Sequence, residues 1–302
     1  MITHRAVYGQ PPSIKIETLA TIINVGPASF VFGEVDVAFA SAAAELCELG
    51  APRRGLVAMA SKLAADIVKV GAVRLRGAAH RPAPSLFYMP GLASRADWGG
   101  AAGLERRGFA ELAAAVRRME ASADWLRDEY AAAKAARARD GRGASDYADG
   151  GGEHGLHGGD WNWLTYVDKG AVSETFAREA PVTAQLLASV PRLMTESPFG
   201  FAFFSALGPG AEIRPHCSPM NLRVRVHVPL VVPEGDVGLG LAGGELRWEP
   251  GKALVFDDSY VHHVWNRGDG DRVLLLFDVW HPDLHDEEIE AIKAMFAPDR
   301  GS

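Results

Sequence analysis

Two histidines in the last third of the sequence, His216 and His262, have side chains that can bind a metal ion. Arginines follow each of them: Arg223 and Arg225 come after the first, and Arg272 comes after the second. Imidazole nitrogens are good ligands for divalent iron, zinc, copper and nickel. A guanidinium group pairs with a carboxylate through two parallel hydrogen bonds. If neighbouring strands bring these residues together, they can hold a metal ion beside a small organic acid.

Strand parity supports a shared cavity, because side chains alternate between the two faces of a strand. Arg223, Arg225 and His227 fall on one face of a predicted strand, and the valines between them fall on the other. The valine face predicts a hydrophobic layer, so the polar face must line a cavity or meet water. His262 and His263 point to opposite faces of their strand, and only one of them can enter the same cavity.

Short strands and turns dominate the chain from residue 161 onward. Such a run of short antiparallel strands is typical of a sandwich or barrel. Two hairpins are expected, one pairing 244–248 with 253–256 and the other pairing 261–265 with 272–280. The remaining predicted elements are strands at 161–167, 201–207 and 222–232 and helices near 181–190 and 286–296.

The preceding part of the chain has a helical pattern. An apolar stripe over 109–130 predicts one long helix that faces the core. Residues 1–80, with apolar stripes over 36–49 and 54–70, predict an N-terminal helical extension to a domain that spans 81–302. The stretch 139–159 is glycine-rich and predicts a flexible loop that contains two solvated histidines, His154 and His157.

Composition excludes several classes of protein. The net charge of −7 argues against a nucleic-acid partner, because phosphate binding needs a basic face. The chain has only 2 cysteines, which cannot form a zinc ribbon or a disulfide scaffold. No apolar run approaches the roughly 20 residues of a membrane helix. No signal-peptide pattern is present, so a cytoplasmic protein is expected, with no prediction of its oligomeric state.

The residues alone leave the metal hypothesis open. Non-haem iron oxygenases commonly have a carboxylate ligand two residues after the first histidine, and this chain has Ser218 there. A pair of strand histidines is more often structural than metal-binding, because half-buried histidines with satisfied hydrogen bonds are common.

Motifs across residues 84–284 change that balance, because they resemble the aspartyl/asparaginyl β-hydroxylase family. The resemblance implies a double-stranded β-helix, or jelly roll, with flanking helices. It also implies an enzyme that uses Fe(II), O2 and 2-oxoglutarate and holds iron with two histidines and no carboxylate. Ser218 then differs only from the glycine that the family often has at that position. The motifs are 207–216, Asn221, Arg223, Arg225, His227, Trp248, 251–252, 256–259, His262, Arg272 and 278–282.

The resemblance implies a role for each matching residue. The iron ligands would be His216 and His262, and no catalytic residue beyond the iron centre is implied. Arg223 would face the prime substrate. Asp257 and Asp258 are expected to be loop and capping residues, because carboxylates beside turns usually bond the local backbone. The residues that would bind 2-oxoglutarate are Ser205, Arg225, His227 and Arg272.

The implied reaction is hydroxylation of the β-carbon of an aspartyl or asparaginyl substrate, either free, carrier-bound or within a peptide. One alternative is another oxidation at the same iron centre, such as desaturation or cyclisation. A different alternative is a jelly-roll protein that binds a small acid without catalysis. The joint presence of Ser205, Arg225, His227 and Arg272 disfavours that alternative, because simple binding would not need all four cosubstrate contacts.

Overall fold

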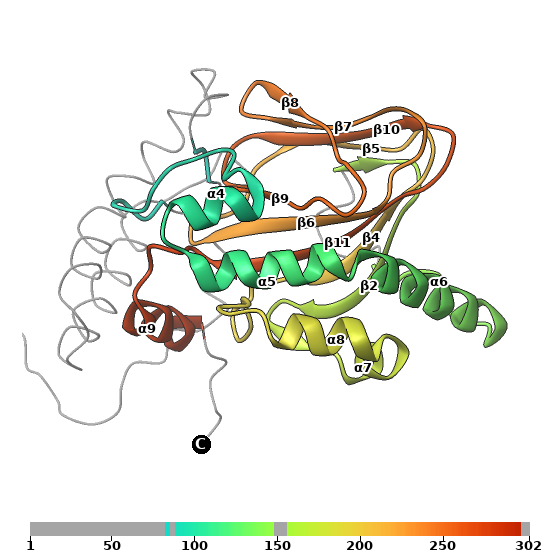
Figure 1. Cartoon of the computed structure of the whole chain (residues 1–302), viewed down its shortest axis with the longest axis horizontal. Coiled ribbons are helices and arrows are strands. Elements are labelled where there is room, and N and C mark those ends of the chain that lie inside the picture. Colours follow the sequence, from blue (N-terminus) through green and yellow to red (C-terminus); the bar gives the residue numbers. More distant parts are fainter. Residues whose placement is uncertain (1–81, 85–87, 148–155, 297–302) are drawn as a thin grey trace, which may run out of the picture.

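Two antiparallel sheets form the centre of the computed structural model, which describes residues 82–84, 88–147 and 156–296 (Figure 1). The larger sheet has the order β3-β2-β4-β11-β6-β9. Its strands are Ala171–Val172, Trp161–Asp168, Ala202–Leu207, Arg272–Trp280, Arg223–Val231 and Leu254–Phe256. The smaller sheet has the order β1-β5-β10-β7-β8. Its strands are His157–Gly158, Glu212–His216, His262–Gly268, Gly235–Leu241 and Gly244–Leu246.

The two sheets and their flanking helices confirm the predicted jelly-roll class. The predicted helical extension over residues 1–80 lies outside the described residues. Among the described residues, no helix is long and apolar enough to cross a membrane.

Helices cover the face of the larger sheet that points away from the smaller one (Figure 1). Valines of β6 reach this layer, where Val224, Val226 and Val228 are buried, as strand parity predicted. Arg223, Arg225 and His227 alternate with these valines and therefore face the interior between the two sheets. The covering helices are α5 (Ala110–Ala121), α6 (Ala123–Arg139), α7 (Glu174–Glu179) and α8 (Pro181–Ala188).

The single helix predicted over 109–130 is wrong, because it is divided at Ser122. This residue leaves helical geometry, with φ −99° and ψ 5°, and caps both α5 and α6. Serine interrupts helices readily because it bonds local backbone groups in other conformations. The apolar stripe continues across the break, since Leu126 and Tyr130 are buried.

Both predicted hairpins are wrong. Strand β8 pairs with β7 in the smaller sheet, whereas β9 pairs with β6 in the larger one. Likewise β10 lies in the smaller sheet and β11 in the larger one. In a jelly roll, strands that follow each other in sequence can lie in opposite sheets, so a turn between them does not indicate pairing.

Two further helices complete the described fold. Helix α4 (Gly100–Arg106) precedes α5, and α9 (Asp286–Phe296) forms the predicted C-terminal helix. Ile289, Ile292 and Phe296 of α9 pack in a second apolar cluster with Trp280, at the end of β11.

The prediction that His157 is a solvated loop residue is wrong. It lies in β1, and its ring contacts those of Tyr147 and Trp161, with centroids 5.5 and 5.6 Å away. Residues 148–155, which include His154, lie outside the described residues.

Candidate metal centre and its cavity

A cavity of about 530 Å³ lies between the two sheets. All seven residues that the sequence analysis assigned to a site line this one cavity. They come from three strands of the larger sheet and two of the smaller sheet. The residues are Ser205, His216, Arg223, Arg225, His227, His262 and Arg272.

The two predicted iron ligands face each other across neighbouring strands. His216 ends β5 and His262 begins β10, and they are directly opposed in the strand register. Their ring centroids are 4.1 Å apart. His263 has the opposite orientation, as strand parity predicted, and its exposed ring stacks on Trp265 at 5.4 Å.

Each histidine of the pair is oriented by a backbone carbonyl two residues before it. The Nδ1 of His216 lies 2.7 Å from the carbonyl oxygen of Arg214, and that of His262 lies 2.9 Å from the carbonyl oxygen of Tyr260. A carbonyl only accepts, so Nδ1 carries the proton and Nε2 of a neutral ring keeps a lone pair. This arrangement is usual for histidines that bind metals.

Burial keeps both rings neutral. It lowers the pKa of His216, and it lowers the pKa of His262 to about 3, with His216 as the next cause. Neutral imidazole is the form that binds a metal ion. The pair therefore fits a divalent transition metal with two nitrogen ligands.

No carboxylate completes a three-ligand set in the described residues, which contain no group of three histidine, cysteine, aspartate or glutamate side chains placed for a metal. Ser218 stands at the position where many non-haem iron oxygenases have an acid. Its buried hydroxyl donates to the carbonyl oxygen of Met220 at 2.7 Å. The resemblance implied a donor set of two imidazoles, and that donor set stays a prediction.

Arg272 is a buried cation that has no anionic partner among the described residues. It is 2% exposed, and within this part of the chain neither Nε nor Nη2 has a hydrogen-bond partner. Its guanidinium lies 5.1 Å from the ring centre of Trp248. Burial lowers the pKa of Arg272 to about 9, so it stays charged at neutral pH. A buried charge normally has a counterion, and a carboxylate suits this one.

A chain of rings connects Arg272 to the histidine pair. His227 lies between Trp248 and Phe256, with ring centroids 6.0 and 4.9 Å away, and Phe256 also contacts His262 at 5.7 Å. Both ring nitrogens of His227 are buried, and no described residue forms a hydrogen bond with either of them. Burial, followed by the charges of Arg225 and Arg272, holds the pKa of His227 well below its usual value.

Ser205 is buried on β4, and its hydroxyl accepts a hydrogen bond from the indole N–H of Trp161 at 2.9 Å. That bond leaves the hydroxyl proton of Ser205 available to a cavity ligand. The sequence placed Trp161 in a predicted strand and assigned it no role in the site. Its contact with Ser205 depends on the pairing of β2 with β4.

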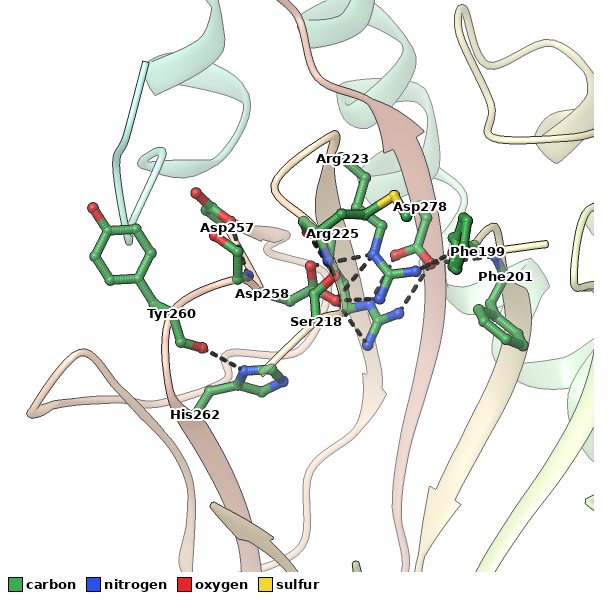
Figure 2. A network of polar contacts seen from close by, with 12 residues as sticks. Phe199, Phe201, Ser218, Arg223, Arg225, Asp257, Asp258, Tyr260, His262 and Asp278 are labelled. Carbon is green, nitrogen blue, oxygen red and sulfur yellow. Dashed lines mark hydrogen bonds and ion pairs between the residues drawn. The ribbon is translucent and has the colours of Figure 1, made fainter. Parts of the chain in front are cut away.

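Arg223 and Arg225 differ from Arg272 because aspartates surround them (Figure 2). Arg223 reaches Asp258 through Nε and Nη2 and Asp278 through Nη1, and its Nη1 also donates to the carbonyl oxygen of Phe199. All three of its guanidinium nitrogens therefore have an acceptor. Its predicted contact with the prime substrate stays a prediction.

Arg225 makes a paired contact with Asp278, Nε to Oδ1 at 2.8 Å and Nη2 to Oδ2 at 2.9 Å. Its Nη1 also lies 3.4 Å from Asp258. Two arginines and two aspartates thus form a buried group with balanced charge beside the histidine pair. We call Arg223, Arg225, Asp258 and Asp278 the charge quartet.

The prediction that Asp258 is a local capping residue is wrong. It lies in a turn, but its carboxylate is 1% exposed and pairs with β6. Burial alone would raise the pKa of Asp258, but the charges of Arg223 and Arg225 hold it well below its usual range. Asp257 does behave as expected, since Oδ1 accepts from the backbone N–H of Ser259.

One feature of the sequence could have identified Asp278 as a residue of the site. It interrupts an otherwise apolar strand, and an acid in such a run is rarely buried without a partner. The partners themselves come from β6 and are not visible from the sequence of β11.

The family model for aspartyl/asparaginyl beta-hydroxylase matches residues 120–282, more than half of the 302-residue chain. The chain belongs to the aspartyl/asparaginyl β-hydroxylase family. The match includes the histidine pair, the charge quartet, Ser205 and Arg272.

Two curated relatives are similar to just under half of the chain. Human aspartyl/asparaginyl beta-hydroxylase is 35% identical over 137 residues, which are 45% of this chain and 18% of that protein. Human aspartate beta-hydroxylase domain-containing protein 2 is 36% identical over 145 residues, which are 47% of this chain and 39% of that protein. The chain thus spans well under half the length of these relatives.

Among solved structures, a Pseudomonas putida prolyl-4-hydroxylase is 22% identical, with a TM-score of 0.33. The alignment covers 53% of this chain and 86% of that one. This similarity is too weak to support a conclusion about function.

Proposed function

We propose that this protein is an Fe(II)/2-oxoglutarate-dependent dioxygenase that hydroxylates the β-carbon of an aspartyl or asparaginyl substrate. One observation carries the proposal: a cavity holds both the neutral histidine pair and Arg272, a buried cation to which none of residues 82–84, 88–147 and 156–296 supplies an anion. The first feature suits a metal ion, and the second suits the carboxylate of an organic acid. Family membership supports the aspartyl type of substrate.

His216 and His262 would hold iron through Nε2, because Nδ1 of each is already bonded to a backbone carbonyl. Bound iron, with 2-oxoglutarate and O2, supplies the oxidising power that no protein side chain has. The chain contributes position, charge and exclusion of water. The two sheets form the walls of the cavity, which limits the access of water to the reacting centre.

Arg272 and Ser205 would bind the distal carboxylate of 2-oxoglutarate. Two nitrogens of the guanidinium lack a partner in the described part of the chain, and the serine has a hydroxyl proton to donate. Arg225 and His227 would contact the end of the cosubstrate that chelates the metal. The ring chain from Arg272 through Trp248 and His227 to Phe256 and His262 supports this order along the cavity.

The charge quartet would keep Arg225 in position for that contact. Arg225 is fixed by Asp278 from β11, and Asp258 lies on its other side. The quartet is electrically balanced, so it adds no uncompensated charge to the cavity. Among the described buried cations that line the cavity, Arg272 is thus the one whose charge a distal carboxylate would balance.

Succinate formation tests this proposal. The purified chain is supplied with Fe(II) and 2-oxoglutarate in air, with and without an aspartyl peptide, and succinate is measured. We expect succinate only when both iron and 2-oxoglutarate are present. Arg272→Ala should abolish it, whereas Arg267→Ala, an exposed arginine five residues earlier on β10, should not. Succinate formation without iron, or equal loss in both variants, would contradict the proposal.

A further inference from the structure

One side of the cavity is covered by aromatic rings. Trp161 and Trp163 come from β2, Phe203 comes from β4, and Phe201 directly precedes β4. We call these four residues the aromatic wall. They line the same cavity as the histidine pair, and Leu276 of β11 packs against them.

The rings of the wall hold one another in place. Trp163 stacks on Phe203 with centroids 4.0 Å apart and planes 17° apart, and it meets Trp161 edge-on at 4.9 Å. Phe201 contacts the edge of Trp163 at 6.3 Å and stays half-buried. Tyr147, in the segment that follows α6, packs on Trp163 with ring centroids 4.6 Å apart. These rings already hold fixed positions before a ligand binds. Little conformational entropy of the protein is therefore lost when a ligand packs against them.

The wall offers no charge to a substrate carboxylate. Of the arginines that line the cavity in the described part of the chain, Arg223 and Arg225 belong to the balanced quartet. Arg272 would bind the cosubstrate under the proposed function. Lys169 is exposed at the rim, at the turn after β2. A part of the substrate that lies against the aromatic wall therefore contacts rings rather than cations.

We propose that the substrate carries an aromatic group next to the aspartyl unit, and that this group packs against the aromatic wall. This inference rests on the proposed function, because the histidine pair defines where the oxidised carbon lies. Ring-on-ring contact in a preformed cavity favours such a substrate through burial and the geometry of aromatic pairs. Free aspartate has no group that could pack against the aromatic wall, so it should bind poorly.

Matched peptides test the inference directly. The probes are N-acetyl-aspartyl-phenylalanine amide and N-acetyl-phenylalanyl-aspartate amide, each compared with its alanine counterpart, together with free aspartate. Binding is measured anaerobically by calorimetry to the full chain loaded with Fe(II) and 2-oxoglutarate. Air is then admitted, and succinate and a product heavier by one oxygen atom are quantified.

We expect one phenylalanine probe to bind at least about tenfold more tightly than its alanine counterpart, a factor typical of one buried ring. Phe201→Ala should reduce that preference to less than about threefold while 2-oxoglutarate binding persists. Trp125→Ala is the matched control, because Trp125 is an aromatic residue on α6 that is 72% exposed and outside the cavity. This variant should keep the full preference.

The outcomes separate the inference from the proposed function. If the loaded protein binds iron and 2-oxoglutarate but binds both probes of each pair equally, or binds neither, the aromatic subsite is wrong and the oxygenase proposal stands. If the protein binds neither iron nor 2-oxoglutarate, the proposed function fails and the inference fails with it. The comparison of probes on the unmodified chain does not depend on how Phe201→Ala folds.

Discussion

Arg225 and Asp278 face each other from neighbouring strands of the larger sheet, and two parallel hydrogen bonds of 2.8 and 2.9 Å join them. The same carboxylate accepts from the backbone N–H of Phe201 at 3.2 Å, so it connects the charge quartet to the aromatic wall. Asp278 is fully buried. It therefore fixes both the arginine beside the candidate metal centre and the start of β4.

Asp278→Asn should destabilise the fold and disturb the site. The variant leaves two buried arginines with one carboxylate, and breaking a buried ion pair from one side costs about 3–5 kcal/mol. We expect a drop of that size in the free energy of unfolding in denaturant titrations. Asp236→Asn is the control, because Asp236 also pairs with two arginines but lies on an exposed part of β7. Equal midpoints for the two variants would contradict the role of Asp278.

The Arg272→Met variant should weaken 2-oxoglutarate binding without lowering the stability of the fold. Loss of a charged hydrogen-bonding partner should weaken 2-oxoglutarate binding at least about tenfold, as measured by calorimetry. The ligand-free protein should be equally or more stable in thermal unfolding, because an uncompensated buried charge is replaced by an apolar side chain.

The matched control for that experiment is Arg267→Met, which removes an exposed arginine from the neighbouring strand. It should leave 2-oxoglutarate affinity unchanged. A large loss of stability in Arg272→Met with unchanged affinity would show that Arg272 serves the fold rather than the cosubstrate.

Asp257 should make the protein less stable as the pH rises. Burial raises the pKa of Asp257 to about 7 from 3.8, although hydrogen bonds from Ser259 oppose the shift. Between these values the folded protein keeps a proton that the unfolded chain has lost. The destabilisation is therefore absent below about pH 4, grows up to about pH 7 and then stays constant.

Asp257→Asn removes this titration but keeps the oxygen that accepts from Ser259. The variant should exceed the wild type in free energy of unfolding by an amount on the order of a few kcal/mol at about pH 8, and by much less at about pH 4. Denaturant titrations at both pH values measure it. A difference that is independent of pH would mean that Asp257 does not titrate in this range.

Strand parity predicted much of the site from sequence. Because the side-chain period is fixed at two, His262 and His263 had to face opposite ways, and the arginines of β6 had to oppose its valines. The structure agrees at each of these positions. The resemblance added the two-histidine centre and the cosubstrate residues, which spacing alone left open.

Pairing between strands was not predictable in the same way. A turn such as that between β10 and β11 looks like a hairpin, but the strands enter different sheets, and local sequence does not encode that choice. The same limit hid Asp258 and Asp278. Their partners approach from β6, and the aromatic wall likewise forms only when β2 lies beside β4.

The anaerobic absorbance spectrum is the most direct test of the two-histidine centre. Fe(II) and 2-oxoglutarate are added to the purified chain, and the metal-to-ligand charge-transfer band is followed. His216→Ala is compared with His263→Ala, which removes the exposed histidine on the opposite face of β10. We predict a band in the unmodified chain and in His263→Ala, and none in His216→Ala. No band in the unmodified chain, or a band that survives His216→Ala, would contradict the proposed iron site.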